Sequence, residues 1–282
     1  MRKLVGWAGG TQQVKSTAIG VGRPPGEGGV RLEFRLLGPL EVVGHAGPVH
    51  TVGRRLPAVL ATLLLHANRT VTVGRLAHGV WQDPPGGASS NIRTYVAQLR
   101  AAFAAAGQPP SRLLTEAGGY RLAVADGELD VASFEALAQA GEHALRRGDP
   151  GAAQDLLQRA KDLWRGEALA GLTAGRLLQA EAARLDWLRL SAMAMWADAA
   201  LAAGRHEVAV AELARLVSAQ PLCEQTWAKL MLALYRCGRR AEALAAYQRA
   251  YRLLDQQLGL VPGRPLQQLQ RQVLAADPAL DP

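Results

Sequence analysis

The second half of the sequence, from Asp130 onward, is helical throughout, and this restricts the fold more than any other feature of the chain. Apolar residues recur at the three- and four-residue spacing of an amphipathic helix, and Gly or Pro interrupts the pattern at intervals of one helix length. The expected helices cover residues 131–147, 151–164, 174–203, 205–219, 222–237, 239–258 and 265–276. Because no strand pattern interrupts them, this half must bury its apolar residues by packing helix against helix.

An internal repeat relates two of the expected helix pairs. Gly204-Arg205 recurs as Gly238-Arg239, an offset of 34 residues, and further identities occur at the same offset. The matching pairs are Ala199 and Ala233, Ala209 and Ala243, Ala211 and Ala245, and Arg215 and Arg249. Thirty-four residues is the period of tetratricopeptide repeats, whose paired helices approach closely at small residues. The repeat therefore predicts a tetratricopeptide-like array, with a generic helical bundle as the alternative.

The preceding segment has a different pattern. We expect strands at residues 31–37, 40–43 and 49–52, helices at 54–66, 73–81 and 88–106, and a hairpin of strands 113–115 and 120–124. A small sheet, three helices and a hairpin in this order are typical of a winged helix-turn-helix. We therefore predict a mainly α protein, with an N-terminal winged helix-turn-helix that has small β-sheets and a C-terminal tetratricopeptide-like all-α domain.

Composition and charge divide the chain at residues 30 and 125. Residues 1–30 are rich in Gly and lack periodicity, so they are interpreted as a disordered arm or the product of a misplaced start codon. Residues 31–125 form the predicted winged-helix domain, and residues 126–282 the predicted helical domain. The net charge of +8 is distributed over the three segments as +3, +6 and −1. The winged-helix segment carries ten arginines and no lysine, and because arginine contacts phosphate and guanine bidentately, the charge favours a nucleic-acid partner.

The third expected helix of this segment has the two faces that groove binding requires. At ~100° per residue, one face is apolar and consists of Ile92, Val96, Leu99 and Phe103. The opposite face carries short polar side chains, and residues 88–106 contain no acid that would repel phosphates. Asn and Gln can pair with adenine, and Thr can contact the thymine methyl group. The predicted base-contacting residues are Ser90, Asn91, Thr94 and Gln98.

Basic and hydroxyl-bearing residues around this helix are candidates for contacts to the DNA backbone. Such contacts fix the position and register of a protein without reading sequence. Arg121, in the expected hairpin, is also a candidate for the adjacent minor groove. The predicted backbone-contacting residues are Arg54, Arg55, Arg69, Arg75, Arg93, Tyr95, Arg100, Tyr120 and Arg121.

No motif in the sequence predicts catalysis, a cofactor or a metal site. The six histidines lack metal-ligand spacing with Cys or carboxylates, and neither a Walker lysine nor a Gly-x-Ser-x-Gly motif occurs. Cys223 and Cys237 lie ~21 Å apart along one expected helix, too far for a disulfide. No apolar run reaches the ~18 residues that a membrane span needs. We therefore expect a cytoplasmic protein that is not an enzyme and does not bind a membrane.

Several short motifs follow one another along the chain. They are Leu63-Leu64-Leu65-His66-Ala67-Asn68, Trp81 with Asp83-Pro84-Pro85, Val96-Ala97-Gln98-Leu99-Arg100, Gly119-Tyr120-Arg121-Leu122, Leu163-Trp164-Arg165-Gly166 and Leu230-Met231-Leu232-Ala233-Leu234-Tyr235-Arg236. Together they resemble the Streptomyces antibiotic regulatory protein family over about residues 31–280. The resemblance implies an OmpR-type winged helix joined to a tetratricopeptide-like bacterial transcriptional activation domain.

The same resemblance implies a function and partners. Members of this family activate secondary-metabolite gene clusters, bind direct repeats near promoters, and contact RNA polymerase and its sigma factor. The implied partners are therefore double-stranded DNA, RNA polymerase with sigma factor, and a second copy of the chain on tandem sites. Four positions depart from the family pattern: Leu56-Pro57 replaces a frequent Gln-Arg, Gly74 replaces an acid, and Glu116 places a negative charge on the wing.

The sequence thus supports a sequence-specific, DNA-binding transcriptional activator. The alternative from another class is a tetratricopeptide scaffold whose basic N-terminal domain contacts protein or RNA. The two hypotheses differ over residues Thr94 and Gln98, because only a DNA reader depends on these side chains for its affinity.

Overall fold

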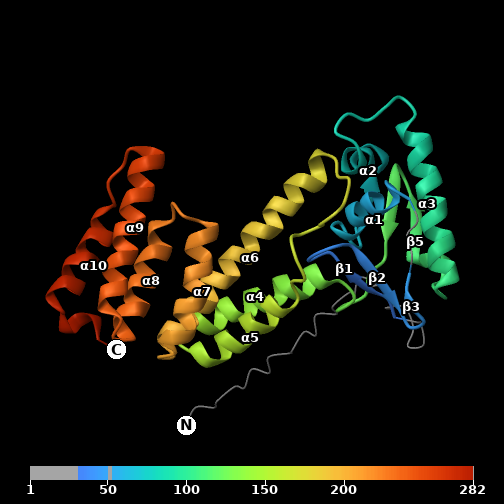
Figure 1. Cartoon of the computed structure of the whole chain (residues 1–282). Coiled ribbons are helices and arrows are strands. Elements are labelled where there is room, and N and C mark those ends of the chain that lie inside the picture. Colours follow the sequence, from blue (N-terminus) through green and yellow to red (C-terminus); the bar gives the residue numbers. More distant parts are fainter. Residues whose placement is uncertain (1–30, 50–52, 282) are drawn as a thin grey trace, which may run out of the picture.

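The computed structural model describes residues 31–49 and 53–281 (Figure 1). The predicted arm, residues 1–30, and residues 50–52 of the third predicted strand lie outside these ranges. Two small sheets and three helices form the N-terminal part, and the remaining helices extend from it in chain order toward the C-terminus (Figure 1). The predicted fold class, a winged helix-turn-helix followed by a tetratricopeptide-like helical domain, is confirmed.

The first sheet is antiparallel and consists of β1 (Glu33–Arg35), β2 (Glu41–Gly44) and β3 (Gly47–Pro48), in that order. Leu32, Phe34 and Leu36 alternate with more exposed residues and are fully buried, as the period of a strand with one covered face requires. The third strand lies two residues earlier than the predicted range. This sheet covers one side of the winged-helix core.

Three helices form the centre of the winged-helix part: α1 (Leu56–Leu64), α2 (Val73–Val80) and α3 (Ala88–Ala105). Pro57 lies in the first turn of α1, where its missing N–H is not needed. The Thr72 hydroxyl caps α2 by accepting a hydrogen bond from the N–H of Arg75. Helices α1 and α2 both pack against α3, so the two of them fix its position and direction.

The second sheet has the order β4-β6-β5 and includes the wing, which is the hairpin of strands β5 and β6. Strands β5 (Leu113–Glu116) and β6 (Gly119–Leu122) form the predicted hairpin, after a 3₁₀ turn at Pro110–Arg112. Strand β4 (Val71–Thr72) pairs with β6 and was not expected from the sequence, because two residues show no periodicity. Through β4, the wing is attached directly to the start of α2.

Seven further helices form the C-terminal part, and each packs against the next from α4 to α9 (Figure 1). They are α4 (Asp130–Arg146), α5 (Pro150–Asp162), α6 (Arg176–Ala202), α7 (His206–Ala219), α8 (Glu224–Arg236), α9 (Arg240–Leu258) and α10 (Arg264–Ala275), with a final 3₁₀ turn at Pro278–Leu280. Helix α10 returns to pack on α8 and α9. The repeated alanines Ala199, Ala233, Ala209 and Ala243 are fully buried, which explains why small residues recur there.

The two parts share one hydrophobic core, and buried carboxylates join them. The N–H of Phe34 in β1 donates to the Glu128 carbonyl oxygen at 2.7 Å, just before α4 begins. The Asp130 carboxylate accepts hydrogen bonds from the N–H groups of Leu36 and Leu37 at 2.8 and 2.9 Å. Burial raises the pKa of Asp130 in spite of these hydrogen bonds.

Glu128 forms a second connection, in a buried ion pair with Arg112 at 2.8 Å. Its other carboxylate oxygen accepts the N–H of Ala125. Burial opposes the charged form of Glu128, but the hydrogen bonds from Arg112 and Ala125 outweigh it and lower the pKa of this carboxyl. The helical part is therefore attached to the winged helix by buried polar groups as well as by apolar packing.

Candidate nucleic-acid interface

Helix α3 has one buried and one exposed face. Ile92, Val96, Leu99 and Phe103 are at most 2% exposed, so the predicted apolar face is confirmed. The sequence contains no acid from Pro84 to Thr115, a stretch that includes the whole of α3. The exposed face of α3 is therefore free of any carboxylate of its own that would repel a phosphate backbone.

The four predicted base-contacting residues all lie exposed on α3. Ser90 and Asn91 are in its first turn, Thr94 is one turn further, and Gln98 is near the middle. The Thr94 hydroxyl donates to the Ser90 carbonyl oxygen at 3.2 Å, which leaves its methyl group and its oxygen lone pairs available. The structure thus brings these side chains together on one surface.

A polar hollow of about 420 Å³ lies along one flank of α3. Its lining residues are Gly53, Arg54, Arg55, Leu56, Tyr95 and Gln98. The Arg55 guanidinium lies 5.1 Å above the Trp81 ring, and Trp81 in turn packs against Tyr95 with ring centroids 6.4 Å apart. No ion pair of Arg54 or Arg55 occurs among the described residues, so both positive charges remain uncompensated beside α3.

Arg93 and Arg100 lie on the other flank of α3, and their surroundings differ. Arg93 is exposed and makes no side-chain hydrogen bond or ion pair within the described part of the chain. Arg100 donates to the Leu113 carbonyl oxygen at 3.0 Å and to the Thr115 hydroxyl at 2.8 Å. Arg93 is thus freely available, whereas Arg100 is held against β5.

The wing residues are less available than the sequence suggested. Tyr120 is only 8% exposed, and its ring lies beneath the Arg100 guanidinium at 5.9 Å. Arg121 pairs with Glu116, which also accepts a hydrogen bond from the Thr70 hydroxyl. These hydrogen bonds from Thr70 and Arg121 lower the pKa of Glu116, so this acid stays charged and compensates one wing arginine.

The last two residues predicted to contact the DNA backbone lie in the turn after α1 and in the first turn of α2. Arg69 is exposed in the turn after α1. Arg75 lies in the first turn of α2, where its Nε donates to His66 Nε2 at 3.0 Å. Both arginines are on the winged-helix part, without a carboxylate partner among the described residues.

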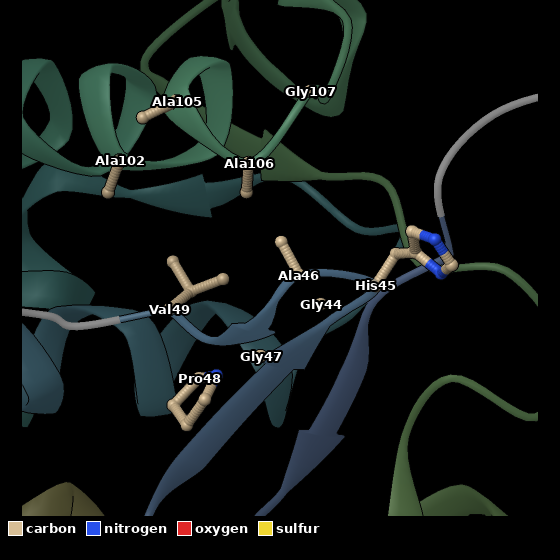
Figure 2. A pocket seen from close by; sticks show the side chains of 10 residues that line it. All are labelled: Gly44, His45, Ala46, Gly47, Pro48, Val49, Ala102, Ala105, Ala106 and Gly107. Atoms are coloured by element: carbon tan, nitrogen blue, oxygen red, sulfur yellow. The ribbon is translucent and has the colours of Figure 1, made fainter.

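A second hollow, of about 430 Å³, lies between the β2–β3 turn and the last turn of α3. Figure 2 shows Ala102 of α3 and Ala106, the residue after α3, facing Val49 and Ala46 across it, with His45 at its edge. Its lining contains no Arg, Lys, Asp or Glu side chain. This apolar hollow therefore contributes no candidate contact to a phosphate.

Two residues near α3 were missed in the sequence. The sequence predicted no role for Trp81 at the interface, yet its ring supports the Arg55 guanidinium. Thr173 lies in the helical part, far along the chain, and its hydroxyl accepts a hydrogen bond from Arg54 Nε at 3.4 Å. No local pattern connects residues 119 positions apart, so only the structure could show this contact.

Neither a metal-binding cluster nor a membrane-spanning helix occurs in the described ranges. No group of three or more His, Cys, Asp or Glu residues there is arranged to hold a metal ion. None of the helices in those ranges combines the length and the apolar character that crossing a bilayer requires.

Two family models match the chain. "Transcriptional regulatory protein, C terminal" matches residues 50–122, and "Bacterial transcriptional activator domain" matches residues 129–274. The first match contains α3 and the wing, and the second contains the helices from α4 to most of α10. The candidate interface thus lies within a domain known from transcriptional regulators.

Individual relatives agree with these matches. The regulatory protein DnrI of Streptomyces peucetius is 35% identical over 257 residues, which cover 89% of this chain and 94% of DnrI. The regulatory protein AfsR of Streptomyces coelicolor is 43% identical over 251 residues, which cover 88% of this chain but only 25% of AfsR. The solved structure of Mycobacterium tuberculosis EmbR in complex with a low affinity phosphopeptide has a TM-score of 0.82 and 35% identity, and the match covers 88% of this chain and 66% of that one. This chain belongs to the Streptomyces antibiotic regulatory protein family of transcriptional regulators, with an OmpR-type DNA-binding domain followed by a bacterial transcriptional activator domain.

Proposed function

We propose that this protein is a sequence-specific, DNA-binding transcriptional activator whose helix α3 enters the major groove. The observation that carries the proposal is the exposed face of α3, which presents Ser90, Asn91, Thr94 and Gln98 without a single acid. A helix fits the major groove, and side chains of these types can read base edges there. Arg54, Arg55 and Arg93 lie on the two sides of this face and supply the phosphate contacts that fix its position.

We further propose that the target is a promoter of a secondary-metabolite gene cluster. The support is similarity to regulators such as DnrI, which this chain matches over nearly the whole of both sequences. In this proposal the winged helix binds direct repeats in the promoter DNA. A surface of the helical domain contacts RNA polymerase and its sigma factor. The protein then acts at the nucleoid, on DNA and without a cofactor.

Footprinting on the promoters that neighbour its own gene tests the proposal. We expect two protected half-sites about one helical turn apart, or a multiple of it, so that two copies bind the same side of the duplex. Affinity for the protected fragment should fall steeply as salt rises, because bound arginines release counterions from the phosphates. Equal affinity for the protected fragment and for a shuffled duplex at every salt concentration would contradict sequence-specific binding.

A further inference from the structure

The segment that connects α5 to α6 crosses the winged helix, and we name residues 165–175 the strap. Its first half is bonded to the β1–β2 turn. The N–H of Arg165 donates to the Leu37 carbonyl oxygen at 2.7 Å, and the N–H of Ala170 donates to the Gly38 carbonyl oxygen at 3.2 Å. Gly38 has a φ of +147°, and a Cβ there would lie 3.0 Å from Arg165 Cβ, so the two segments are in close contact.

The other end of the strap meets the end of α2. The N–H of Gly175 donates to the Gly79 carbonyl oxygen at 2.9 Å. A Cβ at Gly175 would collide with the carbonyl oxygens of His78 and Trp81. Only glycine allows so close an approach, so the strap is fixed at both of its ends.

Between these ends, Thr173 reaches the surface beside the candidate DNA interface. Its hydroxyl accepts a hydrogen bond from Arg54 Nε, and Arg54 lines the polar hollow that also contains Tyr95 and Gln98 of α3. Only Nε of Arg54 takes part in this hydrogen bond. The N–H groups of both terminal nitrogens can therefore donate hydrogen bonds to a phosphate oxygen. An arginine that is already oriented loses less rotamer entropy when it binds.

We propose that Thr173 is a positioning residue for a contact between Arg54 and a phosphate of the DNA backbone, and that the helical domain thereby forms part of the DNA-binding surface. The inference rests on the proposed function, because it requires α3 to dock on DNA. It adds that the affinity of the winged helix depends on a side chain from the other domain. Arg55, held on Trp81, needs no such help from the helical domain.

A double-mutant cycle on the full chain tests the proposal, with the footprinted duplex as the probe. We expect Arg54→Ala to weaken binding ~10-fold and to lower the slope of log affinity against log salt by about one, the value for one phosphate contact. Thr173→Val should weaken binding ~3-fold in the presence of Arg54 and should change nothing in the Arg54→Ala background, whereas Thr173→Ser should bind like the wild type. Ser218→Ala on α7 is the control, because Ser218 is an exposed hydroxyl residue of the helical domain outside the strap.

The outcomes separate the two hypotheses. If the wild-type chain does not bind the duplex specifically, the proposed function fails. If it binds specifically but Thr173→Val weakens binding equally in both backgrounds, or in neither, then Thr173 does not act through Arg54 and only this inference is wrong. Thermal unfolding of each variant shows whether the fold is intact, and Thr173→Ala, which also lacks the hydroxyl, gives a second measurement of the same contact.

Discussion

At the scale of single residues, the contribution of an arginine to DNA binding depends on what already holds its guanidinium. Arg121 forms an ion pair with Glu116, and this carboxylate weakens the electrostatic attraction between Arg121 and a DNA phosphate. Arg100 is directed toward β5 by two hydrogen bonds, and Arg93 has no partner among the described residues. Arg93 should therefore contribute more to DNA binding than its equally basic neighbours.

We predict that Arg93→Ala combined with Arg100→Ala weakens binding to all duplexes by ~1–3 kcal/mol and lowers the salt slope by about one to two. Arg93→Ala alone should account for most of the change in slope. Gel shifts at several salt concentrations measure both quantities. Arg147→Ala, at the exposed end of α4, is the charge-matched control, and an equal effect of this variant would show that overall charge, and not the flank of α3, determines affinity.

Substitutions on the polar face of α3 should change the preference for the specific sequence and leave the salt dependence of binding unaltered. We predict that Thr94→Ala and Gln98→Ala each reduce the preference for the specific duplex over a shuffled one by ~1–3 kcal/mol, because a base contact is lost. The salt slope should stay constant, because neither side chain is charged. Competition binding with both duplexes is the measurement, and an unchanged preference in both variants would favour the protein scaffold alternative.

Glu128 is the residue whose loss should affect stability most clearly. We predict that Glu128→Gln lowers the free energy of unfolding at pH 7 by about 3–5 kcal/mol, because Arg112 is left buried without its counterion. The lowered pKa of Glu128 means that its contribution is present above the unfolded pKa of about 4.3 and is lost as pH falls through the lower folded value. The raised pKa of Asp130 acts in the opposite direction, since its contribution is present at low pH and is lost as pH rises.

Urea unfolding of the wild type and of Glu128→Gln at pH 7 and in this acid range measures the effect. The variant should lose less stability on acidification than the wild type, because it has no carboxylate to protonate at this position. Parallel pH dependences would show that the ion pair does not determine the acid sensitivity.

At the scale of elements, helix α2 contains two glycines with different surroundings. A Cβ at Gly79 would collide with the Thr62 hydroxyl of α1, whereas a Cβ at Gly74 would meet nothing within 4 Å. Thr62 is fully buried, and its hydroxyl donates to the Ala58 carbonyl oxygen, so it has little room to move. The contact between α1 and α2 therefore depends on Gly79.

We predict that Gly79→Ala destabilises the protein by about 1–3 kcal/mol through overpacking. Gly74→Ala should stabilise it by up to ~1 kcal/mol, because alanine is the better helix former and no contact opposes it. Thermal unfolding compares the two variants directly. A destabilised Gly74→Ala variant would show that the effect arises from α2 itself and not from its contact with α1.

Elements with a clear period or flanking turn residues could be predicted from the sequence, whereas the two-residue strand β4 could not. The four apolar residues of α3 and the long helices from α4 onward were found because three or more turns repeat one pattern. Strand β4 was missed because it has only two residues and exists through its pairing with β6. For the same reason the exposed residues of α3 could be selected in advance, while the contacts that hold Tyr120 and Arg121 depend on tertiary packing.

At the scale of the whole molecule, the two domains have one continuous core and are joined by Glu128, Asp130 and the strap. We predict that they unfold in a single cooperative transition. Calorimetric and van't Hoff enthalpies of unfolding should therefore be equal. Two separate transitions, or a calorimetric enthalpy clearly above the van't Hoff value, would show that the connections are too weak to couple the domains.

The fixed strap also has a consequence for promoter architecture. Helices α7–α10 form the end of the molecule that lies away from the winged helix (Figure 1). If the helical array cannot rotate on the winged helix, this end takes the same orientation relative to the duplex at every bound site. A binding site moved by about 5 base pairs, half a helical turn, would then carry that end to the opposite side of the DNA, and a full turn of about 10 base pairs would bring it back. Promoters served by this protein should consequently tolerate changes in spacing only in whole turns of the double helix.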